Sequence, residues 1–309
     1  FMISWLNPGP EDRDLGMDDY RELGVLEALA AVQEIVPDRS IHAVGYCLGG
    51  TLLSIAAAEL ARNSHNPIAS LTFLATQIDF SEPGELQLFI NESQLNFLED
   101  MMWEQGFLDA KQMAGAFQLL RSNDLVWSRN MRAYLLGERS PMIDLMAWNA
   151  DSTRMPYRMH SEYLRKLYLN NEFAEGRFVV DGRPVAFTDI VVPIFSVGTA
   201  SDHVAPWRSV YKSHLLADTE ITFVLTSGGH NAGIVSEPGH PHRQYQIALT
   251  SDHDRYVDPD TWAAEIPMKK GSWWPEWIAW LDQRSGALVP PPRMRMPIAD
   301  APGTYVLQK

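Results

Sequence analysis

The chain has 309 residues, 46% of them hydrophobic, which is enough to bury a sizeable core in one large α/β domain or two smaller ones. Its 25 Lys and Arg against 39 Asp and Glu give a net charge of -14, and no basic run is present, so nucleic acid is not an expected partner. The single cysteine excludes an internal disulfide, and no apolar run approaches the roughly 18 residues of a transmembrane segment. We therefore expect a cytoplasmic globular protein.

Predicted strands alternate with predicted helices at the start of the chain. The apolar run Phe1 to Trp5 predicts a buried strand, and the apolar spacing from Met17 to about Val36 predicts a helix. Ile41 to Tyr46 predicts the next strand, the breaker-free segment 49–61 a helix, and Leu71 to Thr76 a third strand. This alternation favours an α/β fold with a mainly parallel sheet and helices on both faces.

A long, mostly helical segment, 77–189, separates the third strand from the fourth and far exceeds the usual crossover length. It is rich in aromatic residues and holds eight of the 13 Met. Asp181-Gly182, near its end, predicts a tight hairpin turn. We expect an inserted cap (77–189) between two parts of a core (1–76 and 190–309); its methionines form either a helical core or an apolar lining over the site.

The remaining predicted elements complete the sheet and add one helix. Val192 to Gly198 and Ile221 to Thr226 predict the fourth and fifth strands, and the chain after His230 is loop-rich as far as a C-terminal helix. Three tryptophans at i, i+4 and i+7 share one face of that helix: Trp273, Trp277 and Trp280. This face predicts packing on the sheet, with a hydrophobic interface as the alternative.

The stretch GYCLG, which holds Cys47 between Gly45 and Gly49, lies on the turn between a predicted strand and helix. A nucleophile on such a turn is held in a strained conformation, and the two glycines let strand and helix approach closely. Unpaired N–H groups at the helix N-terminus favour the thiolate, and the Leu48 amide could donate to an oxyanion. The alternative is that Cys47 is a small buried apolar residue.

Asp202 and His230 follow the fourth and fifth predicted strands, and the order of nucleophile, acid and histidine is that of the α/β-hydrolase fold. His230 would take the thiol proton and Asp202 would orient the imidazole. His203 could compete as the base, although we favour for it the role of a loop residue that contacts the site without transferring the proton. The histidines at 240–242 and 251–254 lack a strong ligand spacing, so we expect no metal.

Several segments together resemble the catalytic domain of poly(3-hydroxyalkanoate) synthases, and the resemblance covers almost the whole chain. They are GYCLGGTLL (45–53), WNADSTRMP (148–156), YLRKLYLNNEF (163–173), SDHVAPW (201–207), GGHNAGIV (228–235), GSWWPEWIAWL (271–281) and APGTYVLQK (301–309). The C-terminal segments resemble the single-subunit, short-chain class (class I) most.

The resemblance implies polymerisation of (R)-3-hydroxyacyl-CoA, with 3-hydroxybutyryl-CoA as the expected substrate, and release of CoA. It implies acyl groups held on Cys47, with His230 and Asp202 as its partners, a homodimer, and association with polyester granules in the cytoplasm. CoA is then part of the substrate and no cofactor is needed. Family members carry a further N-terminal region, which usually supplies the second oxyanion donor, so the sequence leaves the source of that donor open.

Two other functions remain open. A dienelactone-hydrolase-like or thioester-cleaving cysteine hydrolase has a similar cysteine turn, but such proteins resemble a compact domain without a large cap. A non-catalytic granule-associated structural protein is the alternative from another class, and the presence of Cys47, Asp202 and His230 argues against it.

Overall fold

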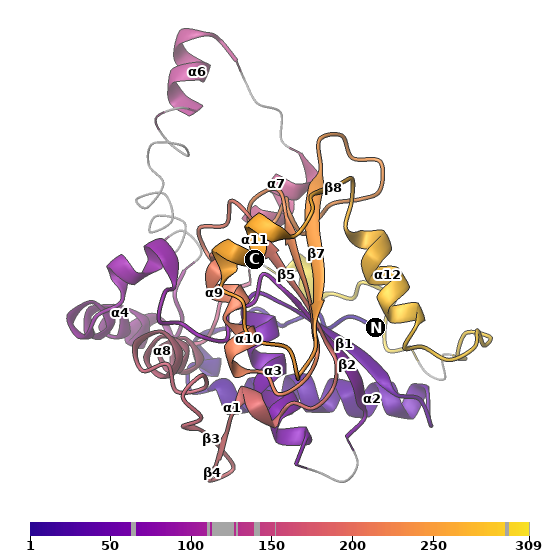
Figure 1. Cartoon of the computed structure of the whole chain (residues 1–309). Helices are drawn as coiled ribbons and strands as arrows, with labels where there is room; N and C mark the ends of the chain where they lie inside the picture. Colours follow the sequence, from indigo (N-terminus) through magenta and orange to yellow (C-terminus); the bar gives the residue numbers. More distant parts are fainter. Residues whose placement is uncertain are drawn as a thin grey trace.

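The computed structural model describes residues 1–62, 66–109, 112, 127, 129–138, 143–151, 153–293 and 297–308. Within these residues lies a six-stranded sheet of order β1-β2-β5-β6-β7-β8 (Figure 1). Its strands are β1 (Ile41–Tyr46), β2 (Ile68–Leu74), β5 (Ile194–Thr199), β6 (Ile221–Thr226), β7 (Gln244–Thr250) and β8 (Lys269–Lys270). The first four are parallel and the last two antiparallel, which confirms the mainly parallel sheet.

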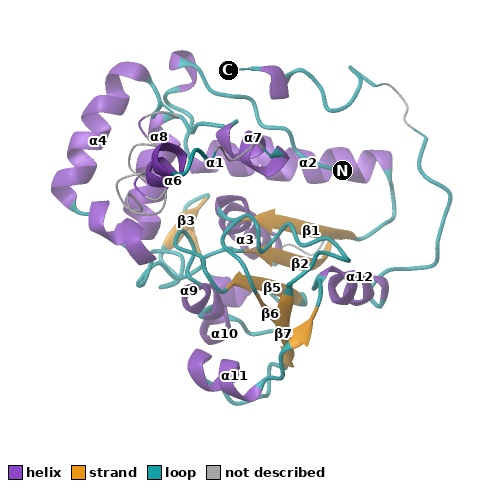
Figure 2. Ribbon diagram, turned by 90° about the horizontal axis from the view of Figure 1, so that it is seen from above, coloured by secondary structure: helices purple, strands orange, loops and turns teal. Residues whose placement is uncertain are grey.

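Helices cover both faces of this sheet (Figure 2). They are α1 (Met17–Asp19), the π-helical segment η2 (Tyr20–Leu26), α2 (Glu27–Ile35), α3 (Leu48–Leu60), α9 (Trp207–Tyr211), α10 (Ser213–Leu216), α11 (Pro259–Glu265) and α12 (Trp274–Asp282). Short 3-10 turns lie near the two ends, η1 (Pro10–Asp12) and η7 (Tyr305–Leu307). The predicted helix after the first apolar run is thus the continuous helical segment α1-η2-α2.

Alternation along the central strands divides the core between the two faces of the sheet, because successive side chains of a strand point to opposite faces. Ile194 and Phe223 belong to the larger core with Ile55 of α3, whereas their chain neighbours Phe195 and Val224 belong to the core on the α12 side. There Trp273 and Trp280 are buried, with ring centroids 6.2 and 5.4 Å from Phe195. The packing of the tryptophan helix on the sheet is therefore confirmed.

The segment between β2 and β5 is mostly helical where it is described. It contains η3 (Gly84–Phe89), α4 (Glu92–Gln105), α6 (Arg129–Leu135), α7 (Asp144–Ala150), α8 (Tyr157–Glu162), the π-helical segment η5 (Tyr163–Leu169), β3 (Phe178–Val180), β4 (Arg183–Val185) and η6 (Phe187–Asp189). Asp181 and Gly182 join β3 to β4 with φ values of 50° and 75°, which confirms the hairpin turn. Residues 110, 111, 113–126, 128, 139–142 and 152, with Met113 and Met142 among them, lie outside the described residues.

One predicted strand is wrong, and strand β7 of the sheet was not predicted. Phe1 to Trp5 forms no strand, and Phe1 is 78% exposed; Trp5 instead stacks on Tyr20 of η2 at a centroid distance of 5.3 Å. The run therefore gains its contacts from a helix, not from strand pairing. The chain after His230 is loop-rich as predicted, but it also contains β7, of which Tyr245–Thr250 pair with β6, and the helix α11.

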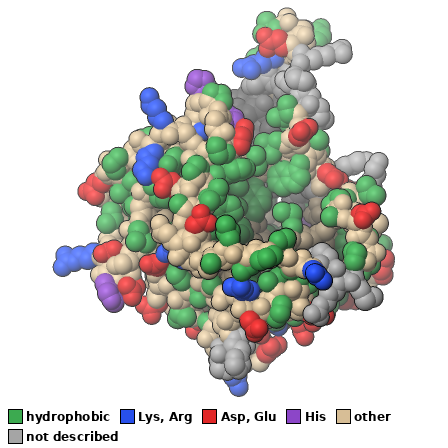
Figure 3. Space-filling model, turned by 90° about the vertical axis from the view of Figure 1, so that its right-hand side faces the viewer, with side chains coloured by type: hydrophobic (Ala, Val, Ile, Leu, Met, Phe, Trp, Pro, Cys, Tyr) green, Lys and Arg blue, Asp and Glu red, His purple; other side chains and the backbone are tan. Residues whose placement is uncertain are grey.

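The face that carries α12 shows apolar side chains near its middle and charged side chains mainly toward its margins (Figure 3). Exposed apolar residues include Ile278 of α12 and Val44 of β1. In the described part of the chain, no helix is both long and apolar enough to cross a lipid bilayer.

Candidate active site

Cys47 occupies the turn between β1 and α3 in a strained conformation. Its φ of 52° and ψ of -125° are uncommon for a residue with a side chain, and it is the residue before the first turn of α3. Its N–H donates to the Leu74 carbonyl of β2 at 2.9 Å, and its carbonyl accepts from the Gly50 amide at 2.9 Å. The backbone is thus fixed on both sides of the turn, and the partly buried thiol lies at a helix N-terminus.

The glycine requirement of this turn differs in part from the prediction. A Cβ on Gly45 would lie 2.4 Å from the Gly50 Cα, so strand and helix do meet closely at Gly45. A Cβ on Gly49 would meet no atom within 4 Å, which contradicts its predicted close approach. Gly50 has that role instead, because a Cβ there would lie 2.0 Å from the Thr76 hydroxyl oxygen. Sequence spacing alone did not distinguish these adjacent glycines.

Asp202 lies in the loop after β5, and its side chain is fully buried. Its Oδ1 accepts from the amides of Val204 (2.8 Å) and Ala205 (2.9 Å), and its Oδ2 accepts from the Thr199 hydroxyl (2.8 Å). Burial raises the pKa of this carboxyl, but these bonds and the one from His230 outweigh it and keep the pKa below its ordinary value. Asp202 is therefore a fixed carboxylate.

His230, in the loop after β6, is held against this carboxylate. Its Nδ1 lies 2.7 Å from Asp202 Oδ2, and its side chain is 17% exposed. Burial lowers the pKa of His230, but hydrogen bonds with Asp202 and with the Cys47 sulfur outweigh it and raise the pKa from 6.5 to about 10. Cys47, His230 and Asp202, which lie far apart in the sequence, thus form one line of contacts suited to nucleophilic acyl transfer.

A family model described as "alpha/beta hydrolase fold" matches residues 1–237. The chain belongs to the alpha/beta hydrolase family. The mainly parallel sheet, the strained turn before α3 and the loops that carry Asp202 and His230 are the features of this α/β-hydrolase fold that the sequence predicted.

Three curated relatives are named as polyester-forming enzymes. The chain is 38% identical to a poly(3-hydroxyalkanoate) polymerase of Methylorubrum extorquens over 100% of its own length and 51% of the relative's. It is 36% identical to poly(3-hydroxyalkanoate) polymerase subunit PhaC of Rhizobium meliloti (99% and 50%) and 35% identical to the protein of that name from Cupriavidus necator (100% and 54%). The resemblance stated from the motifs is confirmed, and the chain spans about half the length of these relatives.

The other predicted residues of this α/β-hydrolase site are placed as follows. Leu48 is the first residue of α3, so its N–H precedes the helical hydrogen-bond ladder. His203 is partly buried beside Asp202, but the imidazole that the Asp202 carboxylate binds is that of His230. Among the residues that the structure describes, no group of three or more His, Cys, Asp or Glu could hold a metal ion.

Sequence reasoning missed a set of residues around His230. The Tyr46 ring lies 5.1 Å from the His230 ring, centroid to centroid, and 6.3 Å from that of Trp148 of α7. Its phenol donates to Asn231 Oδ1, and the Asn231 amide donates to Asn149 Oδ1 at 2.9 Å. Trp148 and Asn149 belong to the WNADST segment, so the resemblance pointed to them without indicating where they lie.

A pair of tyrosines from η5 completes the surroundings of Cys47. The Tyr163 and Tyr168 hydroxyls are 3.5 Å apart, and both rings pack on Phe80, which follows β2. Burial raises the pKa of the Tyr168 phenol, and the charges of Cys47 and Asp202 add to the rise, although the bond with Tyr163 lowers it. These two neutral phenols therefore lie within electrostatic reach of the candidate nucleophile.

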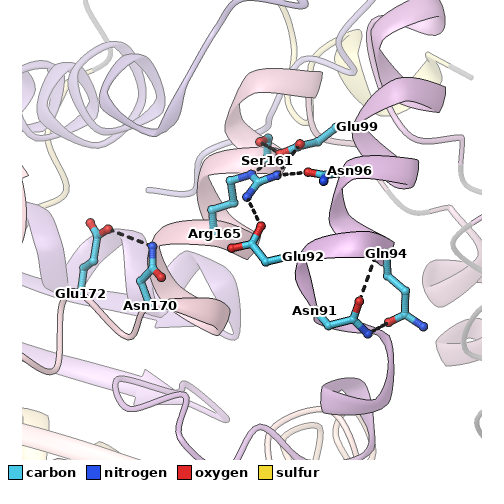
Figure 4. Close-up of polar contacts among 9 residues, drawn as sticks. All are labelled: Asn91, Glu92, Gln94, Asn96, Glu99, Ser161, Arg165, Asn170 and Glu172. Carbon is cyan, nitrogen blue, oxygen red and sulfur yellow. Dashed lines mark hydrogen bonds and ion pairs between the residues drawn. The ribbon is translucent and has the colours of Figure 1, made fainter.

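Arg165 fixes the opposite side of η5 to α4 (Figure 4). Its Nε and Nη2 donate to the two carboxylate oxygens of Glu99 at 2.6 and 2.7 Å, and Nη1 donates to Glu92 at 3.0 Å. Nη2 also reaches Asn96 at 2.7 Å, and the Ser161 hydroxyl donates to Glu99. This two-point contact orients the segment that carries Tyr163 and Tyr168.

Proposed function

We propose that this chain carries the acyl-transfer centre of a poly(3-hydroxyalkanoate) polymerase, which joins (R)-3-hydroxyacyl groups from CoA into polyester and releases CoA. The observation that carries the proposal is the contact of Cys47, at the start of α3, with a His230 imidazole that Asp202 binds at 2.7 Å. The polymerase relatives support the reaction class. We propose (R)-3-hydroxybutyryl-CoA as the substrate, following the resemblance to class I.

In the first step, Cys47 is acylated. The pKa of His230 is raised to about 10, so at neutral pH its imidazolium faces the Cys47 sulfur and can stabilise negative charge on it. The thiolate attacks the thioester carbonyl, and the Leu48 N–H donates to the oxyanion. The bond from the carbonyl carbon to the CoA sulfur then breaks, and His230 gives its proton to that sulfur. One thioester replaces another, so the step is close to isoenergetic.

In the second step, the polymer is extended. Acylation removes the thiolate, and with it two of the interactions that raise the pKa of His230. The neutral imidazole then takes the proton of a 3-hydroxyl, whose oxygen attacks the acyl-Cys47 carbonyl. The carbon–sulfur bond breaks, an oxyester forms, and the thiolate and imidazolium are regenerated. The change in imidazole charge thus fits His230 for both steps.

Water competes with the 3-hydroxyl for the acyl group on Cys47, so the site must exclude water. We propose that 77–189 is a cap inserted between core parts 1–76 and 190–309 and that it restricts water at Cys47. Support comes from Trp148 and Asn149 of α7, which reach Tyr46 and Asn231 beside the site. We also propose, from the resemblance, a cytoplasmic homodimer at the surface of polyester granules that needs no cofactor.

The test is to supply (R)-3-hydroxybutyryl-CoA, follow CoA release, and identify the acyl product by mass. The proposal predicts oligomeric hydroxybutyrate from the wild-type chain and none from Cys47→Ala. Free 3-hydroxybutyrate alone would replace the proposal with a thioester hydrolase, and CoA release that is unchanged in Cys47→Ala would remove Cys47 as the nucleophile. Absence of both release and acyl-Cys47 would favour the structural alternative.

A further inference from the structure

Three polar side chains from three separate segments meet beside the candidate base. Tyr46 is the last residue of β1, Asn231 directly follows His230, and Asn149 lies in α7. The Tyr46 phenol donates to Asn231 Oδ1 and also approaches the His230 carbonyl at 3.3 Å. Asn231 Nδ2 donates to Asn149 Oδ1 at 2.9 Å. A continuous series of hydrogen bonds therefore runs from the nucleophile turn, through the histidine loop, to α7.

The Tyr46 ring supplies a restraint on His230 that Asp202 does not supply. The hydrogen bond with Asp202 fixes Nδ1 but does not by itself fix the plane of the imidazole. The Tyr46 ring lies against the imidazole at 5.1 Å with an interplanar angle of 35°. Burial raises the pKa of the Tyr46 phenol, so this side chain stays neutral and acts as a donor, not as a base. Its position, in turn, depends on Asn231.

The third member, Asn149, lies at the exposed end of this series. Its helix α7 is in the segment between β2 and β5, and Trp148, beside it in the sequence, is 55% exposed over Tyr46. The bond between Asn149 and Asn231 is also exposed, so water competes with it and it breaks readily. A contact of this kind can form and break as α7 moves.

We propose that Asn231 is a positioning residue that couples the seating of α7, through Asn149, to the alignment of His230 by Tyr46. The proposal rests on the function proposed above for its consequence in catalysis. With α7 seated, Asn231 is held from both sides and the Tyr46 ring limits the tilt of the imidazole toward the sulfur and the substrate hydroxyl. With α7 displaced, the contact with Asp202 remains, but the Tyr46 ring restricts the tilt less. A change in the position of α7 then changes the orientation of the imidazole that transfers the proton.

The first readout is alkylation of Cys47 by iodoacetamide across pH, which needs no polymerase activity and is specific because Cys47 is the sole cysteine. Asn149→Ala is expected to slow alkylation at neutral pH by about twofold to tenfold, as expected for one exposed hydrogen bond, and to shift the pH profile. Asn149→Asp keeps the acceptor oxygen and is expected to restore the rate. Met146→Ala, on an exposed position of the same helix, is the matched control and should behave as wild type.

The second readout is the coupling between residues. The double variant Asn149→Ala with Asn231→Ala is expected to be no slower than Asn231→Ala alone, because both changes interrupt the same series. In turnover of (R)-3-hydroxybutyryl-CoA, Asn149→Ala should lower kcat and leave KM nearly unchanged. Wild-type alkylation by Asn149→Ala, or additive effects in the double variant, would overturn the inference. If wild type releases no CoA while the alkylation effects hold, the proposed function fails and the positioning role stands.

Discussion

The π-helical segments η2 and η5 each carry an arginine, and the two arginines lie in different environments. Arg21 of η2 is 2% exposed and contacts Glu59 of α3 and Asp181 of the β3–β4 hairpin. Arg165 of η5 has a side chain that is 31% exposed and binds Glu99 in two places. An unpaired charge costs far more in a buried site than in an exposed one. The contacts that hold η2 to the core around Cys47 are thus buried, whereas those that hold η5 to α4 are ones that water can replace.

The largest expected effect is a loss of catalysis when Asp202, the buried carboxylate of the candidate site, is changed. Asp202→Asn removes the carboxylate that binds His230 Nδ1, so kcat for CoA release should fall by about a thousandfold or more. His203→Asn, one residue further along, should cause a much smaller loss, because His203 is not the imidazole bound to Asp202. Equal losses in the two variants would assign the base to His203 and contradict the proposed role of His230.

The next effect tests the comparison of the two arginines. Arg21→Met leaves Glu59 partly buried and unpaired, so the free energy of unfolding should fall by about 3 kcal/mol. Arg165→Met should lower it less, by about 1 kcal/mol, because Arg165 is already 31% exposed and Glu99 keeps its hydrogen bond from the Ser161 hydroxyl. Urea unfolding of both variants measures the difference. Similar losses would show that burial does not distinguish the two segments.

A smaller effect on stability distinguishes the glycines of the nucleophile turn. Gly45→Ala forces a Cβ against the Gly50 backbone and should destabilise the fold by about 1–3 kcal/mol. Gly49→Ala meets no neighbour within 4 Å and lies inside α3, so it should be neutral or stabilising by up to about 1 kcal/mol. Thermal unfolding of the two variants gives the comparison, and a destabilised Gly49→Ala would restore the prediction made from the sequence.

The pH dependence of stability is a separate test of the contact between His230 and Asp202. The pKa of His230 is raised from 6.5 to about 10, so the stabilisation by its imidazolium is complete below pH 6.5 and is lost as the pH rises through about 10. The difference in unfolding free energy between wild type and His230→Gln should therefore decrease over this range. Because Cys47 contributes to the raised pKa, the decrease should be smaller in a Cys47→Ala background. A difference that grows with pH would contradict this electrostatic account.

Local pattern was sufficient to predict the elements that position Asp202 and His230. Strand β6 has the predicted bounds, as does β1 before Cys47, because both combine apolar runs with clear turn residues. Strand β5 begins two residues later than predicted. The order of Cys47, Asp202 and His230 then followed from the topology, since parallel strands bring their carboxyl ends to one edge of the sheet.

The sequence could not predict features that depend on distant pairing. Strand β7 has mixed polarity between proline-rich and acidic loops, and its strand form depends on its pairing with β6. Phe1 to Trp5 has the pattern of a strand, yet the contact of Trp5 with Tyr20 decides its course. Asn231 and Asn149 are 82 residues apart, so no spacing rule joins them. In each case the missing information is a tertiary contact.

The most direct measurement is the intact mass of the protein, quenched soon after mixing with (R)-3-hydroxybutyryl-CoA, followed by peptide mapping. The account predicts a 3-hydroxybutyryl group on Cys47 that appears together with free CoA and is absent in Cys47→Ala. An acyl group on another residue, or CoA release that proceeds without acylation of Cys47, would contradict the claim that this sulfur carries the chain.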